Sequence, residues 1–306
     1  MTATVLSLLL ASGMTAPPVT ALAFAPGGES IVVGSQAGVE IRDWPGRRTQ
    51  SVLETRLSGI HDLSFSPDGT RLVVAGGTPA EDGTLEIFSW PERELTQSVR
   101  LHDDVIYAVA WRSDSGVLAT AGLDGSVALY DPGEQRTLRT FTGHSRGVLA
   151  IEFLSDEHLV SAGIDQTLRV WNPATGELLR TLDNHTRPVA DLALRPQQGD
   201  DALPMLASVS ADRTVRLWQP TIGRLVRFAR LERTVPLAVE WTDGGRRLAI
   251  ACSDGHVRVI DPDTVELVQD LTAIEGWAYS LAVHPSRAEL AVGGRGGALA
   301  AALPAE

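Results

Sequence analysis

The sequence predicts an all-β fold of seven small antiparallel sheets arranged around an axis, and two observations support it. The first is a repeated phrase: VSAGIDQTLRVWNP at 160–173 returns as ASVSADRTVRLWQP at 207–220, and in weaker form as ATAGLDGSVALYDP at 119–132. The second is a period of two within each unit, which indicates strands rather than helices. Because a small sheet cannot bury both of its faces alone, we expect such sheets to stack face to face around a common axis.

The length of the repeat sets the number of sheets. The last residue of the apolar strand after each tight turn serves as a marker, and the markers are Arg42, Phe88, Tyr130, Trp171, Trp218, Ile260 and Ala302. Successive markers lie 46, 42, 41, 47, 42 and 42 residues apart, so seven units fill the 306 residues. We expect one domain, with repeats at about 15–56, 57–101, 102–143, 144–184, 185–231, 232–273 and 274–306.

Repeat four shows the expected elements of one unit. Strands are predicted at 147–153, 158–163, 167–172 and 174–182. Clusters of Asp, Asn, Gly and Pro separate the strands in this and other repeats, as in SPDG and DPDT, and these residue types favour turns. Each unit is therefore expected to be a four-stranded antiparallel sheet.

The last repeat lacks a predicted fourth strand, and residues near the N-terminus are candidates to supply it. Only three residues follow the predicted third strand at 297–303, so we expect the apolar stretch 3–11 to supply the fourth strand and to close the ring. The alternative is a secretory signal peptide, which needs a positively charged beginning, whereas residues 1–10 carry no charged side chain.

Composition excludes several classes of function. The single Cys252 excludes an internal disulfide and a cysteine-rich metal site, and no apolar run reaches the roughly 18 residues of a membrane-spanning helix. All 26 basic residues are Arg, so chemistry that needs a lysine is absent. The net charge of −12 disfavours nucleic acid as a partner. We expect a monomer without cofactor, metal ion or membrane association, located in the cytoplasm, with an exported location left open.

The segment GHSRGVLAIEFLSDEHLVSAGIDQTLRVWN at 143–172 and the period of the repeats resemble the WD40 family in a bacterial type. The resemblance covers the whole chain and implies a seven-bladed β-propeller. It also implies a buried hydrogen-bonded set in each typical repeat, which we call the latch. By position, the latches are His144, Ser161, Asp165 and Trp171; His185, Ser208, Asp212 and Trp218; and His102, Thr120, Asp124 and Tyr130.

Ser, His and Asp are also the residues of a hydrolase triad, but we favour a structural role for the latches. The same set would occur three times in one chain, and the resemblance places each serine inside a strand under a tryptophan. Donors and acceptors of these side chains can satisfy one another in sequence, so each latch would fix a turn to its own sheet.

Function in the WD40 family is usually binding, and the resemblance implies binding on the face that carries the turns between second and third strands. Large apolar and aromatic side chains are expected on this turn face, and protein interfaces use such groups. The candidate partner-binding residues are Trp277, Tyr279, Tyr107, His61, Leu123 and Ile164. We therefore expect a non-catalytic scaffold that binds a protein or peptide.

Other functions stay open. One is a propeller enzyme or sensor with a metal or redox site at the channel mouth, although His61, His256 and His284 show no shared metal-binding spacing. Another is a module that works with a c-type haem domain, since the first two repeats also resemble bacterial propellers of that kind; no C-x-x-C-H occurs in this chain. A third is an acidic partner at the arginines of GRLVRFARLER, 223–233.

Overall fold

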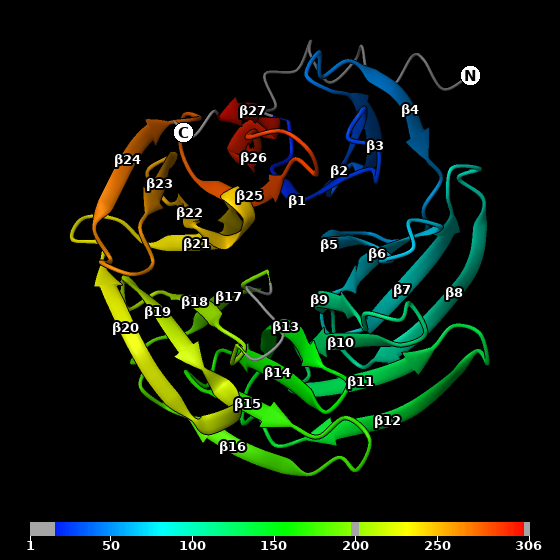
Figure 1. Cartoon of the computed structure of the whole chain (residues 1–306). Helices are drawn as coiled ribbons and strands as arrows, with labels where there is room; N and C mark the ends of the chain where they lie inside the picture. Colours follow the sequence, from blue (N-terminus) through cyan, green and yellow to red (C-terminus); the bar gives the residue numbers. More distant parts are fainter. Residues whose placement is uncertain (1–15, 197–201, 303–306) are drawn as a thin grey trace.

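Seven antiparallel sheets stand in a ring in the computed structural model, which describes residues 16–196 and 202–302 (Figure 1). We call the sheets blades 1 to 7 in chain order. Blades 1 to 6 have four strands each, and blade 7 has three strands among the described residues. The all-β propeller predicted from the repeat is therefore confirmed. Within the described part, no helix has the length and hydropathy to cross a lipid bilayer.

Each blade runs outward along the chain, from an innermost strand at the axis to an outer strand at the rim. The innermost strands are β1 (Val19–Phe24), β5 (Ile60–Phe65), β9 (Ile106–Trp111), β13 (Val148–Ser155), β17 (Val189–Leu194), β21 (Pro236–Thr242) and β25 (Ala278–Val283). The second strands are β2 (Ser30–Ser35), β6 (Arg71–Thr78), β10 (Leu118–Gly122), β14 (His158–Gly163), β18 (Leu206–Ser210), β22 (Arg247–Cys252) and β26 (Leu290–Gly294).

The third and outer strands complete the blades. The third strands are β3 (Gly38–Asp43), β7 (Asp82–Ser89), β11 (Ser126–Asp131), β15 (Leu168–Trp171), β19 (Thr214–Gln219), β23 (His256–Ile260) and β27 (Leu299–Ala302). The outer strands are β4 (Thr49–Leu53), β8 (Leu95–His102), β12 (Arg136–Thr142), β16 (Leu178–Leu182), β20 (Arg224–Arg230) and β24 (Leu267–Thr272). Short 3₁₀ turns are η1 (Pro220–Ile222), η2 (Asp243–Gly245) and η3 (Arg295–Gly297).

Strand pairing confirms the period found in the sequence. The marker residue pairs with the second strand at the same position in every blade, for example Trp171 with Leu159 and Trp218 with Leu206. The outer strand of blade 4 begins later than the predicted residue 174. Asn172 Oδ1 accepts the backbone N–H groups of Ala174 and Thr175 at 2.9 Å, and this turn holds the residues before Leu178 out of the strand.

The hydrophobic core lies between blades rather than inside them. Among the described residues, seven clusters of buried apolar side chains form, one at each junction of neighbouring blades, including the junction of blades 7 and 1. The second strands are covered by neighbours on both faces; all five residues of β10, β18 and β26 are buried. This double burial explains why the second strands are continuously apolar instead of alternating.

Polar contacts join blade 7 to blade 1 and so close the ring. Trp44 Nε1 donates a hydrogen bond to Glu289 Oε2 at 2.7 Å, and Arg47 Nη1 donates to the carbonyl of Leu299 at 3.1 Å. His284 Nε2 lies 3.1 Å from the carbonyl oxygen of Gly28. The predicted closing strand 3–11 lies outside the described residues and stays a prediction, as does the single domain spanning the whole chain.

Candidate functional site

The latch of blade 4 brings its four predicted residues into contact. His144 Nδ1 lies 3.0 Å from both oxygens of Asp165, and His144 Nε2 lies 2.7 Å from the hydroxyl of Ser161. Trp171 Nε1 donates to the same hydroxyl at 2.8 Å. The Ser161 side chain is buried in the strand, so no substrate can reach its hydroxyl. The predicted contacts are present, and the structural role of the set stays a prediction.

Blade 5 repeats the arrangement with similar distances. His185 lies 2.8 Å from Asp212 through Nδ1 and 2.8 Å from Ser208 through Nε2, and Trp218 Nε1 donates to Ser208 at 2.8 Å. Burial alone would raise the pKa of Asp212, but hydrogen bonds from Thr214 and His185 outweigh it and hold this pKa at about 2. Burial lowers the pKa of His185, against the opposing effect of Asp212. The carboxylate is therefore ionised at neutral pH.

Blade 3 departs from the predicted latch at its fourth member. His102 Nε2 lies 2.8 Å from Thr120 Oγ1, and His102 Nδ1 lies 3.2 Å from Asp124, as predicted. The hydroxyl of Tyr130 does not contact Thr120; it donates to Gln97 Oε1 in blade 2 at 2.9 Å. A phenol carries its polar atom at the far tip of the ring, whereas the indole N–H lies on its side. Tyr130 therefore links two blades instead of completing the latch.

We expect Trp171→Phe to lower the free energy of unfolding by about 1 to 3 kcal/mol, because the Ser161 hydroxyl loses its indole donor and remains buried. Denaturant unfolding of the purified variant measures this loss. Ile260→Val, at the marker position of blade 6, is the comparison; it removes one methylene from a buried apolar site and should cost about 0.5 to 1.5 kcal/mol. Wild-type stability in Trp171→Phe would contradict a stabilising latch.

A β-bulge near the start of every innermost strand shapes the mouth of the central channel. One residue in each of these seven strands drops out of the pairing with the second strand, and a bulge of this kind re-aims the side chain that it carries. All seven bulged residues line one central cavity of about 530 Å³. They are Thr20, His61, Tyr107, Leu149, Ala190, Leu237 and Tyr279.

Two aromatic pairs flank this mouth and contain four of the predicted partner-binding residues. His61 and Tyr107 stack with ring centroids 4.4 Å apart, and Trp277 lies 5.9 Å from Tyr279. The Trp277 side chain is 48% exposed, which is unusual for an indole. Burial lowers the pKa of His61, so its ring is neutral at neutral pH and stacks as an uncharged ring.

The other two predicted residues lie in the turns between second and third strands. Leu123 and Ile164 are half-buried, and the backbone N–H of each bonds across to the approach of an innermost strand, to Val105 and to Gly147 respectively. Neither side chain is among the residues that line the central cavity, so both lie outside the channel mouth.

Four carboxyl groups lie deeper in the same cavity, and the sequence analysis missed them. They are Asp62, Glu152, Asp191 and Glu240, all on innermost strands. Burial raises the pKa of Asp62 and of Asp191 to about 7. Burial, together with the neighbouring carboxyls, raises the pKa of Glu152 to about 8 and that of Glu240 well above its usual value. The only hint in the sequence was an acidic residue interrupting an otherwise apolar first strand.

Two of these carboxyls also join neighbouring blades. The backbone N–H of Val109 in blade 3 donates to Asp62 Oδ2 of blade 2 at 2.8 Å. The N–H of Val239 in blade 6 donates to Asp191 Oδ2 of blade 5 at 2.9 Å. No arginine is among the described residues that line the cavity, and no three His, Cys, Asp or Glu side chains in the described part are placed to hold a metal ion. The four carboxyls thus face the channel without a counter-ion.

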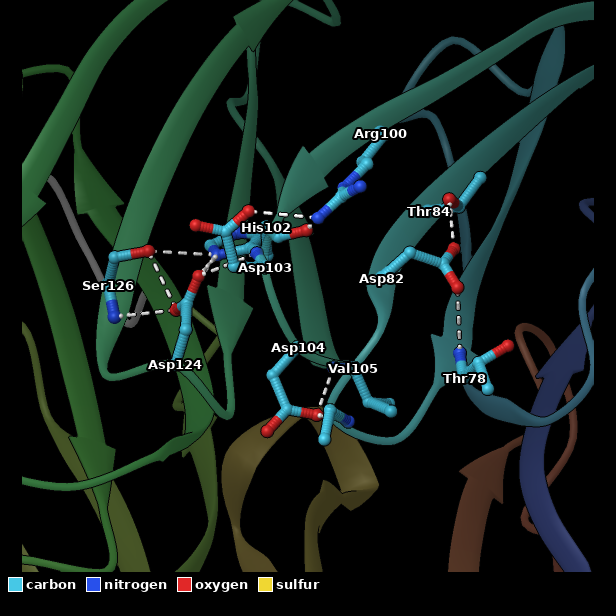
Figure 2. Close-up of polar contacts among 11 residues, drawn as sticks. Thr78, Asp82, Thr84, Arg100, His102, Asp103, Asp104, Val105, Asp124 and Ser126 are labelled. Atoms are coloured by element: carbon cyan, nitrogen blue, oxygen red, sulfur yellow. Dashed lines mark hydrogen bonds and ion pairs between the residues drawn. The ribbon is translucent and has the colours of Figure 1, made fainter.

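Acidic side chains also gather on the turn face at blades 2 and 3 (Figure 2). Asp103 and Asp104 precede β9, Asp124 lies in the turn after β10, and Asp82 begins β7. Asp124 accepts the backbone N–H of Asp103 at 3.1 Å, and Asp104 accepts that of Ala80 at 2.8 Å, which ties three turns together. The one cation drawn among them, Arg100, pairs with Asp103 at 2.9 Å.

Curated proteins similar to this chain are WD-repeat proteins of eukaryotes. WD repeat-containing protein VIP3 of Arabidopsis thaliana is 29% identical over 44% of this chain and 46% of its own length. Nuclear distribution protein PAC1 of Ajellomyces capsulatus is 32% identical over 35% of this chain and 23% of its own length. Actin-interacting protein 1-2 of Arabidopsis thaliana is 32% identical over 47% of this chain and 24% of its own length. The chain thus aligns with less than half of each of these relatives, and a bacterial type of repeat stays a prediction.

The family profile "WD domain, G-beta repeat" matches residues 48–89, 93–131, 135–172 and 176–219. These ranges cover more than half of the chain and contain the third strands of blades 2 to 5, where the latches of blades 3, 4 and 5 end. Together with the ring of seven sheets and the repeated contacts of His, Ser and Asp, the match shows that this chain belongs to the WD40 repeat family.

Proposed function

We propose that this protein is a non-catalytic scaffold that binds a protein or peptide on its turn face. The observation that carries the proposal is the pair of aromatic contacts at the channel mouth, His61 with Tyr107 and Trp277 with Tyr279. Large rings with a polar tip dominate the binding energy of protein interfaces, and an indole half exposed on a rigid ring of strands is ordered before binding. Leu123 and Ile164 extend the same surface along the turns.

The relatives support a binding role. The name of Actin-interacting protein 1-2 states an interaction with another protein, and this relative shares 32% identity with the chain over 151 residues. A monomeric state and a cytoplasmic location belong to the same proposal.

The channel carboxyls favour a second candidate, an enzyme or sensor that uses the channel mouth. Carboxyl groups with a strongly raised pKa inside a cavity are typical of acid–base sites. Metal analysis and a screen for hydrolase and redox activity on the purified protein test this alternative, and a haem-bearing partner would support the module hypothesis. We favour the scaffold, because the two aromatic pairs at the mouth form a surface of the kind that protein interfaces use.

We expect the double variant Trp277→Ala with Tyr107→Ala to lose at least about 30-fold in affinity for peptides selected on the wild-type protein from a random display library, since truncated hot-spot residues each cost about 2 kcal/mol or more. Titration calorimetry measures the affinity. The melting curve should stay close to wild type, because both rings lie at the surface of the turn face.

The control is Arg224→Ala with Arg227→Ala on the outer strand β20, far from the mouth, which should leave the affinity unchanged. The reverse pattern, with binding lost in the arginine variant and kept in the aromatic one, would instead favour an acidic partner at the rim of blade 5.

A further inference from the structure

Acidic side chains surround the mouth of the channel on two levels. On the turn face, Asp103 and Asp104 lie directly before β9, whose bulged residue Tyr107 belongs to the candidate surface. The side chain of Asp103 is 92% exposed and is opposed by Arg100 alone among the residues in Figure 2. Inside the channel, four more carboxyls lie among lining residues that include no arginine.

The order of residues along the innermost strands sets the depth of these groups. The bulged residues come first and form the mouth. Asp62 and Asp191 follow one residue after the bulges of β5 and β17, and Glu152 and Glu240 follow three residues after those of β13 and β21. The channel therefore presents aromatic and apolar side chains at its opening and carboxyl groups below them.

We propose that the partner is a basic peptide segment that inserts one arginine or lysine side chain into the channel mouth. This inference rests on the proposed binding function of the turn face and names its ligand by charge complementarity. A basic side chain has an apolar stem and a charged head, so its stem packs on the Tyr107 and Tyr279 rings while its head meets the carboxyls. The exposed Asp103 and the half-buried Asp104 attract the rest of the segment before contact.

Other occupants fit these residues less well. A divalent cation needs three or more ligands close together, and the described residues offer no such group. An acidic peptide or a nucleic acid meets carboxylates both at the rim and in the channel, in a protein whose net charge is already −12. A basic side chain instead supplies a counter-ion to these carboxyls.

The test is a selection of random displayed peptides on three forms of the full chain. These are the wild type, the channel variant Glu152→Gln with Glu240→Gln, and the rim variant Asp103→Asn with Glu81→Gln. Glu81 is exposed in the turn between β6 and β7, on the turn face. The substitutions keep shape and hydrogen-bonding oxygens, so folding is preserved and a thermal melt verifies it. A control with the same change of charge is Asp156→Asn with Glu157→Gln in the turn between β13 and β14, at the opposite face.

We expect peptides selected on the wild type to share an arginine or lysine at one position. The channel variant should bind these peptides at least tenfold more weakly than the wild type does. The rim variant should bind several-fold more weakly at low salt and lose this difference at high salt, and the control should match the wild type.

The results separate this inference from the function on which it rests. Peptides that bind through the aromatic rings but share no basic residue, or basic peptides that bind the channel variant as tightly as the wild type, would overturn the inference and keep the scaffold. Failure of the wild type to select any peptide, or full binding by Trp277→Ala with Tyr107→Ala, would overturn both.

Discussion

Asp165→Ala is expected to lower the free energy of unfolding by about 3 kcal/mol at neutral pH, because several buried hydrogen-bond donors lose a charged acceptor. Asp165 lies 3.0 Å from His144 Nδ1 and accepts the N–H of Ser145 at 3.1 Å and the hydroxyl of Thr167 at 2.9 Å. Its side chain is only 5% exposed, so water does not replace these bonds. Urea unfolding of the variant and the wild type measures the difference.

The pH dependence of this loss follows from the pKa of Asp165. Burial raises that pKa, but the hydrogen bonds and charge of His144 outweigh burial and hold it well below its usual value. Because the pKa of Asp165 is lower in the folded than in the unfolded chain, its carboxylate stabilises the fold above the unfolded pKa near 4, and this stabilisation is lost as the pH falls. The difference in free energy of unfolding between variant and wild type should therefore narrow in acid. Asp183→Ala, at an exposed carboxyl between blades 4 and 5, should cost almost nothing. Equal stabilities of the two variants would contradict a buried latch.

The free energy of unfolding of the wild type should fall by at least about 4 kcal/mol between pH 5 and pH 8.5, because the fold resists the ionisation of four channel carboxyls that ionise freely in the unfolded chain. The pKa of Asp62 and of Asp191 is raised to about 7, and that of Glu152 to about 8, chiefly by burial. Because these pKa values are higher in the folded chain, the free energy of unfolding is fully retained below the unfolded pKa near 4. It is lost as the pH rises through the folded-state pKa values of about 7 to 8.

Glu152→Gln isolates the carboxyl contribution from other titrating groups. The variant and the wild type should be about equally stable at pH 5, and the variant should be more stable by about 2 kcal/mol at pH 8.5, because an amide cannot ionise. His61 and His185, whose pKa values burial lowers, act in the opposite sense below pH 6.5 but equally in both proteins. Parallel pH profiles of the two proteins would show that the channel does not suppress ionisation of Glu152.

Contacts between residues of the same repeat were predicted well from the sequence. The latch residues His144, Ser161 and Asp165 meet at the predicted places, because the spacing of strands and turns within about 40 residues decides their contacts. The same local frame failed for Tyr130, whose hydroxyl reaches Gln97 in the preceding blade. Contacts across a blade junction depend on how two repeats pack, and a repeat pattern contains no such information.

The sequence by itself determined an all-β chain of seven units and the His, Ser or Thr, and Asp side chains of each latch, since hydrophobic period, turn residues and hydrogen-bonding groups act over short distances. Only the tertiary structure decided what meets at the axis. Asp62, Glu152, Asp191 and Glu240 lie far apart in the chain, and each is an ordinary polar residue of a first strand. Closure of the ring turns these four strands toward one channel, where the shared burial of their carboxyls raises the pKa of each.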